Sequence, residues 1–174
     1  MFSKGSYVIY RSEGVCVISD IRRENFNALG GEGEFYILNP INDMRSVVYV
    51  PVDNEALTGM MRPILSAEEI NKLCEEVREI RLELPPETRV RSLKLRELLS
   101  LGDRRELVIL VNTLEDFFAL AEEKGKKIGS TEKNAHARAL KLLYDEFSYA
   151  SDISDTEMLL AVIRRETECG DKAM

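Results

Sequence analysis

Two clusters of basic residues are the groups in this chain whose types and spacing best suit ligand binding. Arg89, Arg91, Lys94 and Arg96 form the first cluster, and Lys126, Lys127 and Lys133 form the second. Both lie near predicted helix starts, where free backbone N–H groups can bind phosphate and basic side chains can neutralise it. Two such helix starts side by side could hold a phosphate backbone. The glutamates that flank both clusters are equally typical of an ordinary solvated surface.

Residue types that would support catalysis or metal binding are sparse. The single histidine, His136, and the three widely spaced cysteines, Cys16, Cys74 and Cys169, match no metal-ligand spacing. The sequence has no Gly-rich phosphate loop, no nucleophile elbow and no H-E-x-x-H motif. We therefore expect a protein that is not an enzyme, with no metal or other cofactor and no small-molecule substrate.

Composition limits the class of protein further. The chain has 174 residues, 44% hydrophobic and 32% charged, which suits one large folded domain or two small ones. Its net charge of -7 is unfavourable for binding nucleic acid by overall charge, so any DNA contact must come from a local patch. No apolar run approaches the roughly 20 residues of a membrane span, and the N-terminus lacks the apolar core of a signal peptide. Together with the few cysteines, this predicts a cytoplasmic protein without a membrane partner.

The first 62 residues have the pattern of short strands. Runs rich in β-branched and aromatic residues at 7–10, 15–21, 35–38 and 47–52 are separated by turn residues. This predicts a small, strongly bent sheet or a Tudor/SH3-like β-barrel. The last run reaches Pro51, and proline in a strand pattern is typical of an edge strand or a strand end. An exposed edge can pair with a strand of another protein.

Beyond residue 62 the apolar period is helical. Helix starts are predicted near Ser66, Glu87, Asp103, Ser130 and Ser154, with breaks that include Gly102 and Gly125. The apolar spacing along these segments predicts a compact antiparallel bundle. We therefore predict an α+β protein, with a β domain at 1–62 followed by an all-helical domain at 63–174.

The N-terminal domain resembles the RNA polymerase-interacting domain of the CarD/CdnL family of bacterial transcription regulators, which the bacterial transcription-repair coupling factor shares. The resemblance is carried by Phe2, Lys4-Gly5-Ser6, Val8-Ile9-Tyr10, Gly14, Tyr36-Ile-Leu38, Val50-Pro51-Val52 and Gly59-Met-Met-Arg62. It continues into the helical part at Ser100-Leu-Gly102-Asp103 and at Ile128-Gly-Ser130-Thr-Glu132-Lys133.

The resemblance implies a protein that adds a strand to the β subunit of RNA polymerase and modulates promoter open-complex stability through DNA contacts. The implied polymerase-binding residues are Arg22, Arg23, Arg45, Val47, Val48, Tyr49 and Val50. The implied DNA-binding residues are Thr88, Arg89, Arg91, Lys94, Lys126, Lys127 and Lys133. Well-studied family members have a tryptophan wedge where this chain has Thr88, and the chain contains no Trp. We therefore expect DNA contact to be mainly electrostatic.

Two alternatives stay open at this point. The first is a polymerase-docking module that does not act on DNA, which the missing wedge and the acidic balance favour. The second is a small-barrel RNA-binding protein with a helical appendage. Residues 1–62 carry six Lys or Arg against eight Asp or Glu, and this acidic balance argues against RNA binding.

Overall fold

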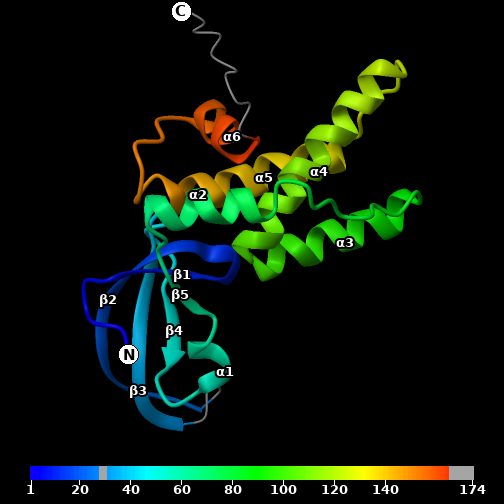
Figure 1. The fold of residues 1–174 in the computed structure, drawn as a ribbon. Coiled ribbons are helices and arrows are strands. Elements are labelled where there is room, and N and C mark those ends of the chain that lie inside the picture. Colours follow the sequence, from blue (N-terminus) through cyan, green and yellow to red (C-terminus); the bar gives the residue numbers. More distant parts are fainter. Residues whose placement is uncertain (28–30, 165–174) are drawn as a thin grey trace, which may run out of the picture. The chain divides into compact units, whose positions relative to one another are not determined.

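The computed structural model describes residues 1–27 and 31–164 (Figure 1). Its contacts divide the chain into two compact units, Met1–Ile64 and Leu65–Met174. The first unit contains the strands and the second contains five helices of nine residues or more within the described part of the chain. This arrangement confirms the predicted α+β class.

The first unit is built on one antiparallel sheet. Its strands are β1 (Tyr7–Tyr10), β2 (Gly14–Phe26), β3 (Gly31–Pro40), β4 (Val48–Pro51) and β5 (Met61–Pro63), and their order in the sheet is β4-β3-β2-β1-β5. A 3₁₀ turn at Arg11–Glu13 joins β1 to β2, and the short helix α1 (Glu55–Thr58) precedes β5. The β-branched and aromatic runs of the sequence lie within β1 to β4, as β propensity predicts.

The long strands β2 and β3 form a curved hairpin that supports the whole sheet (Figure 1). The pairing register shifts between Ile18 and Asp20, so that Ser19 is an extra residue in β2. The Ser19 hydroxyl donates a hydrogen bond of 3.1 Å to the carbonyl oxygen of Ile37. The extra residue allows both Ile18 and Ile21 to face the core, because side chains alternate between faces on either side of it.

The sheet is open. The two edge strands, β4 and β5, each pair with a single neighbour in the part of the chain that the structure describes. The predicted barrel is therefore a curved sheet that does not close. Its core consists of Val8, Tyr10, Cys16, Ile18, Tyr36, Leu38, Val50 and Met61.

The second unit is a helical bundle. Its helices are α2 (Ala67–Glu76), α3 (Thr88–Leu101), α4 (Arg104–Glu123), α5 (Ser130–Phe147) and α6 (Thr156–Arg164). The helix start predicted near Ser66 is formed by a capping box, in which the Ser66 hydroxyl accepts from the N–H of Glu69 and the Glu69 carboxylate accepts from the N–H of Ser66. Every residue from Leu107 to Leu114 is buried, so α4 is the central helix, as its nearly continuous apolar sequence predicts.

The segment at residues 77–87 begins with a turn, continues as an extended segment from α2 to α3 and is tied to α4. The N–H of Leu82 donates to the Thr113 hydroxyl at 3.0 Å, and the Arg81 guanidinium forms an ion pair with Asp116. The same carboxylate also receives Arg164 from α6 at 3.1 Å. Burial raises the pKa of Asp116, but the hydrogen bonds from Arg81 and Arg164 outweigh it and leave the pKa below its usual value.

None of the helices described in either unit is long and apolar enough to cross a membrane.

Candidate functional sites: a sheet edge and a basic pocket

The outer edge of β4 is the first candidate site. The N–H of Val52 donates to the carbonyl oxygen of Glu34 on β3. This bond shows which residues of β4 direct their backbone groups toward β3. In an antiparallel pair, alternate residues direct their backbone groups toward the neighbour and away from it. Val48 and Val50 therefore direct their backbone toward β3, whereas Tyr49 directs its N–H and C=O outward. Pro51 has no N–H, so it offers the outer edge a carbonyl group alone.

Aromatic side chains cover the face of the sheet that carries Tyr49. The Tyr49 ring lies 4.8 Å from that of Phe26, and the Phe26 ring lies 5.4 Å from that of Phe35. Phe35 is fully buried although it faces away from the main core, because these rings cover it. Arg22 is on the same face of β2 and is held by Glu24 at 2.6 Å and Asp20 at 3.6 Å. An aromatic platform with one paired arginine therefore borders the sheet edge.

The structure places the other predicted polymerase-binding residues differently around this edge. The Val50 side chain is fully buried and so is not available to a partner, and the partly buried Val48 packs against the same core. Arg23 follows Arg22 in β2 and so points to the opposite face from Tyr49. Val47 and Arg45 are exposed and precede β4, and Arg45 lies in the turn that leads to it.

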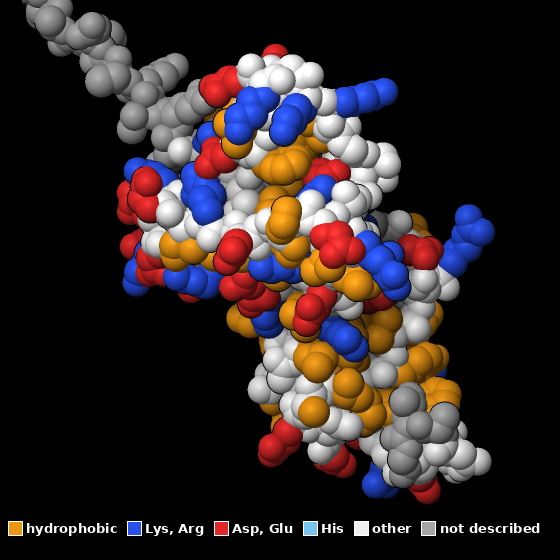
Figure 2. All heavy atoms as spheres, turned by 90° about the vertical axis from the view of Figure 1, so that its right-hand side faces the viewer, with side chains coloured by type: hydrophobic (Ala, Val, Ile, Leu, Met, Phe, Trp, Pro, Cys, Tyr) orange, Lys and Arg blue, Asp and Glu red, His pale blue; other side chains and the backbone are white. Residues whose placement is uncertain are grey.

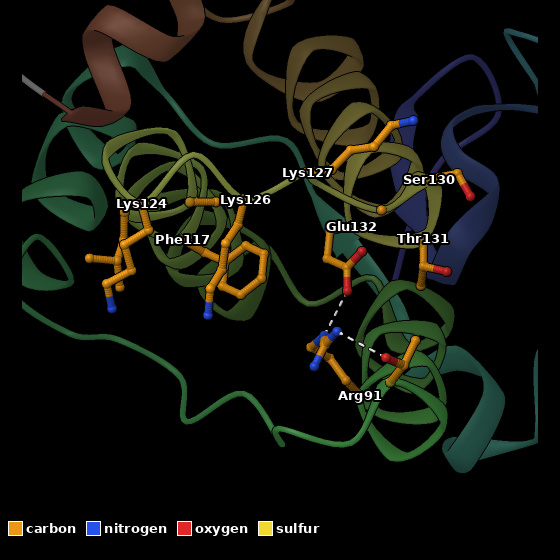
Figure 3. A pocket seen from close by; sticks show the side chains of 12 residues that line it. Arg91, Phe117, Lys124, Lys126, Lys127, Ser130, Thr131 and Glu132 are labelled. Atoms are coloured by element: carbon orange, nitrogen blue, oxygen red, sulfur yellow. Dashed lines mark hydrogen bonds and ion pairs between the residues drawn. The ribbon is translucent and has the colours of Figure 1, made fainter.

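A pocket of about 510 Å³ in the helical unit is the second candidate site. It lies where the starts of α3 and α5 meet the end of α4 (Figure 3). We call it the basic pocket, since four basic side chains and one acidic side chain line it. The lining residues are Thr88, Arg91, Phe117, Leu120, Ala121, Lys124, Lys126, Lys127, Gly129, Ser130, Thr131 and Glu132.

The backbone at the end of α4 fixes the loop that carries the three lysines. The N–H of Lys126 donates to the carbonyl oxygen of Ala121 at 2.8 Å, and the N–H of Gly125 donates to that of Glu122 at 2.9 Å. This pair of bonds is the Schellman motif, which requires a left-handed residue after the helix end. Gly125 supplies it, with φ of 60°. The directions in which Lys124, Lys126 and Lys127 leave the backbone are thus set by helix termination.

Arg91, one of the predicted DNA contacts, is bound within the protein. Its guanidinium donates to the Glu132 carboxylate at 2.6 Å and to the carbonyl oxygens of Pro85 and Pro86 at 2.8 and 3.0 Å. The side chains of Arg91 and Glu132 are only 12% and 3% exposed, so the pair joins α3 to α5 at a nearly dry position. The same guanidinium lies 5.8 Å from the centre of the Phe117 ring. Arg91 therefore shapes the basic pocket and neutralises Glu132.

The other predicted DNA-binding residues are divided by the structure. Thr88, Lys126 and Lys127 line the basic pocket. The Lys94 ammonium donates to the carbonyl oxygen of Glu83 at 2.7 Å and so holds the extended segment. Arg89 and Lys133 are exposed but are not part of the pocket lining.

Sequence reasoning missed Lys124, Phe117 and Ser130 as members of this site. A signal for Lys124 was present, because Lys124-Gly-Lys-Lys127 is a dense basic run directly after a helix. Phe117 carried no such signal. It lies in an apolar helix, and its place outside the core cluster is visible only once the helices are packed.

Buried thiols and the single histidine complete the inventory of reactive groups. Burial, with a smaller contribution from the charge of Glu13, raises the pKa of the Cys16 thiol to about 12. Cys74 is buried as well, and Cys169 lies outside the described residues. His136 Nε2 lies 2.6 Å from a Glu115 carboxylate oxygen, and its ring packs against Phe118. No group of His, Cys, Asp and Glu in the described part of the chain is arranged to hold a metal ion.

The chain thus combines a small open sheet that has two edge strands with a helical bundle that carries a basic pocket. Comparison with family models makes this specific: residues 2–65 match the CarD-like/TRCF RID domain. The first unit is therefore a CarD-like RNA polymerase-interacting domain, and this domain supports RNA polymerase as a partner of the chain. A search of curated proteins gave no match.

Proposed function

We propose that this protein regulates transcription by docking the outer edge of β4 on the β subunit of RNA polymerase and by contacting promoter DNA with its helical unit. The contact adjusts the stability of the open promoter complex, and the protein acts by binding rather than by catalysis. The observation that carries the proposal is the outward-directed backbone of Tyr49, at the edge of a sheet that belongs to a polymerase-interacting domain. Backbone hydrogen bonds to such an edge supply affinity, and neighbouring side chains supply specificity.

The test of docking is the variant Tyr49→Pro. Proline at this position removes the outward N–H but leaves the hydrogen bonds of Val48, Val50 and Val52 to β3 in place. We expect co-purification of the β subunit to fall at least tenfold. The matched control is Tyr49→Ala, which loses the aromatic ring but keeps the N–H, and we expect it to bind more tightly than Tyr49→Pro.

Both variants should first show the circular dichroism spectrum of the parent chain. Equal binding by Tyr49→Pro and the parent chain would exclude this edge as the docking strand. Proline at Val48 or Val50 is a poorer test, because it would break the bonds that hold β4 in the sheet.

The proposed DNA contact uses the rim of the basic pocket, with the exposed Arg89 and Lys133 nearby. Lysines on a loop beside a helix start can neutralise phosphates without reading sequence. Each lost phosphate contact lowers the slope of log affinity against log salt by about 0.9. The double variant Lys126→Ala/Lys127→Ala should therefore shorten the lifetime of polymerase–promoter complexes and lower that slope by about 2. Lys72→Ala, on the exposed surface of α2, is the control.

A polymerase-docking module without DNA action is the second candidate. It is favoured by the internal hydrogen bonds of Arg91 and Lys94. Because of these bonds, fewer basic side chains are free to bind phosphate than the sequence predicts. If the lysine double variant leaves the lifetime of the promoter complex unchanged at two salt concentrations, this second reading replaces the first.

A further inference from the structure

We infer that the basic pocket binds a single nucleotide unit, with its phosphate among the lysines and its base against Phe117. This inference shares lysines with the proposed DNA contact but does not depend on it. A pocket of about 510 Å³ lies within the roughly 300–1,000 Å³ that small-ligand sites occupy. Duplex DNA is too wide to enter such a space and can contact only the rim of the pocket.

The net positive charge of the pocket favours an anionic ligand. The ion pair between Arg91 and Glu132 cancels the one acidic side chain of the lining. The three lysines that remain, Lys124, Lys126 and Lys127, are exposed and have no acidic partner within the lining. In Figure 3, Lys126 and Phe117 lie on the wall opposite Arg91, and Lys127 extends away from them. An anion beside Lys124 and Lys126 would meet ammonium groups, while the Glu132 carboxylate, which lies close to Gly129, is held and neutralised by Arg91.

Donors at the start of α5 suit a phosphate in particular. Gly129, the residue before the helix, has no side chain with which to cap the first turn. The first N–H groups of a helix have no partner within the helix. Ser130 and Thr131 lie in the same lining, as does Thr88 at the start of α3, whose hydroxyl oxygen accepts from Arg91 at 3.4 Å and can still donate. These donors supplement the lysines and give the anion a defined position.

An inorganic anion would leave the apolar half of the pocket unused. Phe117 is only partly buried and does not belong to the core of the unit. Leu120, which is 48% exposed, and Ala121 continue the same wall. In the upper part of Figure 2, basic side chains border exposed apolar ones in this way. A planar base would cover this wall, and stacking on an aromatic ring contributes about 1–3 kcal/mol per base.

The test is a nuclear magnetic resonance titration of the full chain with AMP, inorganic phosphate and the single-stranded tetranucleotide dT4. We expect saturable shifts at the amides of Gly129, Ser130 and Thr131. AMP or dT4 should bind at least tenfold more tightly than inorganic phosphate. Tighter binding of AMP identifies a free nucleotide as the ligand, and tighter binding of dT4 identifies an unpaired nucleotide of melted DNA.

Two sets of variants separate a built site from diffuse charge. Lys126→Glu/Lys127→Glu should weaken binding of all three probes at least tenfold. The charge-matched control Lys72→Glu/Lys141→Glu, at exposed positions outside the pocket lining and outside the proposed DNA contact, should not. Phe117→Leu keeps an apolar side chain but removes the aromatic face, so it should abolish the preference over inorganic phosphate. Dispersed spectra of each variant establish that it is folded.

Shifts that do not saturate, or equal losses in the two lysine double variants, would overturn the inference. Neither result bears on polymerase docking, which Tyr49→Pro tests separately. Nucleotide binding with an unchanged promoter-complex lifetime in the Lys126→Ala/Lys127→Ala variant would keep the pocket and exclude the DNA contact. A shortened promoter-complex lifetime in that variant, without saturable nucleotide binding by the parent chain, would support the DNA contact and exclude the pocket as a nucleotide site.

Discussion

At the residue scale, the backbone of Gly125 decides where the lysines of the basic pocket lie. Its φ of 60° is in the left-handed region, and a Cβ added there would meet no atom within 4 Å. Substitution therefore acts through the backbone alone. We expect Gly125→Ala to lower the free energy of unfolding by about 1 kcal/mol, measured by urea denaturation.

Asparagine tolerates the left-handed region better than alanine does, so Gly125→Asn should cost less and is the matched control. Equal stability of Gly125→Ala and the parent chain would show that the loop adopts another conformation at no cost. Weakened phosphate binding in Gly125→Ala would show that the helix end positions the lysines.

The buried thiol of Cys16 makes a prediction about alkaline pH. Because its pKa is raised to about 12 in the folded protein, the unfolded chain loses this proton first as the pH rises. The stability that the neutral thiol contributes is complete below the unfolded pKa of about 8.5 and is lost as the pH rises toward the folded value. The difference in unfolding free energy between the parent chain and Cys16→Ala should therefore narrow between pH 9 and pH 12. A constant difference would mean that the folded protein lets this thiol ionise.

At the scale of elements, the Arg91–Glu132 ion pair is the link to test between α3 and α5. Both side chains are nearly buried, and removal of one partner leaves the other charge without compensation. We expect Arg91→Met to lower the free energy of unfolding by about 3 kcal/mol. The double variant Arg91→Met/Glu132→Met should recover part of that loss. If the two single losses simply add, the ion pair does not couple the helices.

Strands and helices were largely predictable because their signals are local. The β-branched runs give β1 to β4, and the apolar period with its caps gives the main helices. The extra residue at Ser19 was not predictable, since it depends on which residues of β3 lie opposite. The apolar residues Val77 and Ile80 keep the helical spacing of α2, but α2 ends at Glu76, where Val77, Arg78 and Ile80 make turn hydrogen bonds and Arg81 and Leu82 then bond to α4.

The candidate sites were predictable only in part. The edge position of β4 followed from the proline at its end, and both basic helix starts followed from composition. The internal bonds of Arg91 and Lys94 did not follow, because Glu132 and the carbonyl oxygen of Glu83 meet these side chains only after the helices pack. A charge in a sequence therefore reveals its type but not whether the fold already neutralises it.

At the scale of the whole molecule, the two units differ in the size of their cores. Among the described residues, eight buried side chains form the core of the first unit and nineteen form that of the second. Since stability rises with buried apolar area, a fragment of residues 65–174 should fold alone and unfold at higher urea than a fragment of residues 1–64. Circular dichroism of the two fragments checks this. An unfolded 65–174 fragment would show that the units share one folding transition.

The basic pocket belongs to a chain whose net charge is -7. The attraction of DNA to the pocket and its repulsion by the net charge therefore extend over different distances. At about 0.01 M salt the Debye length is about 30 Å, so an approaching duplex meets the repulsion of the whole chain. At about 0.1 M it is about 10 Å, and distant charges are screened while the pocket is not. The association rate of the unbound protein with DNA should therefore pass through a maximum as salt increases. A protein that RNA polymerase already holds at a promoter no longer has to approach the DNA against this repulsion. The affinity of its DNA contact should therefore only decrease as salt increases.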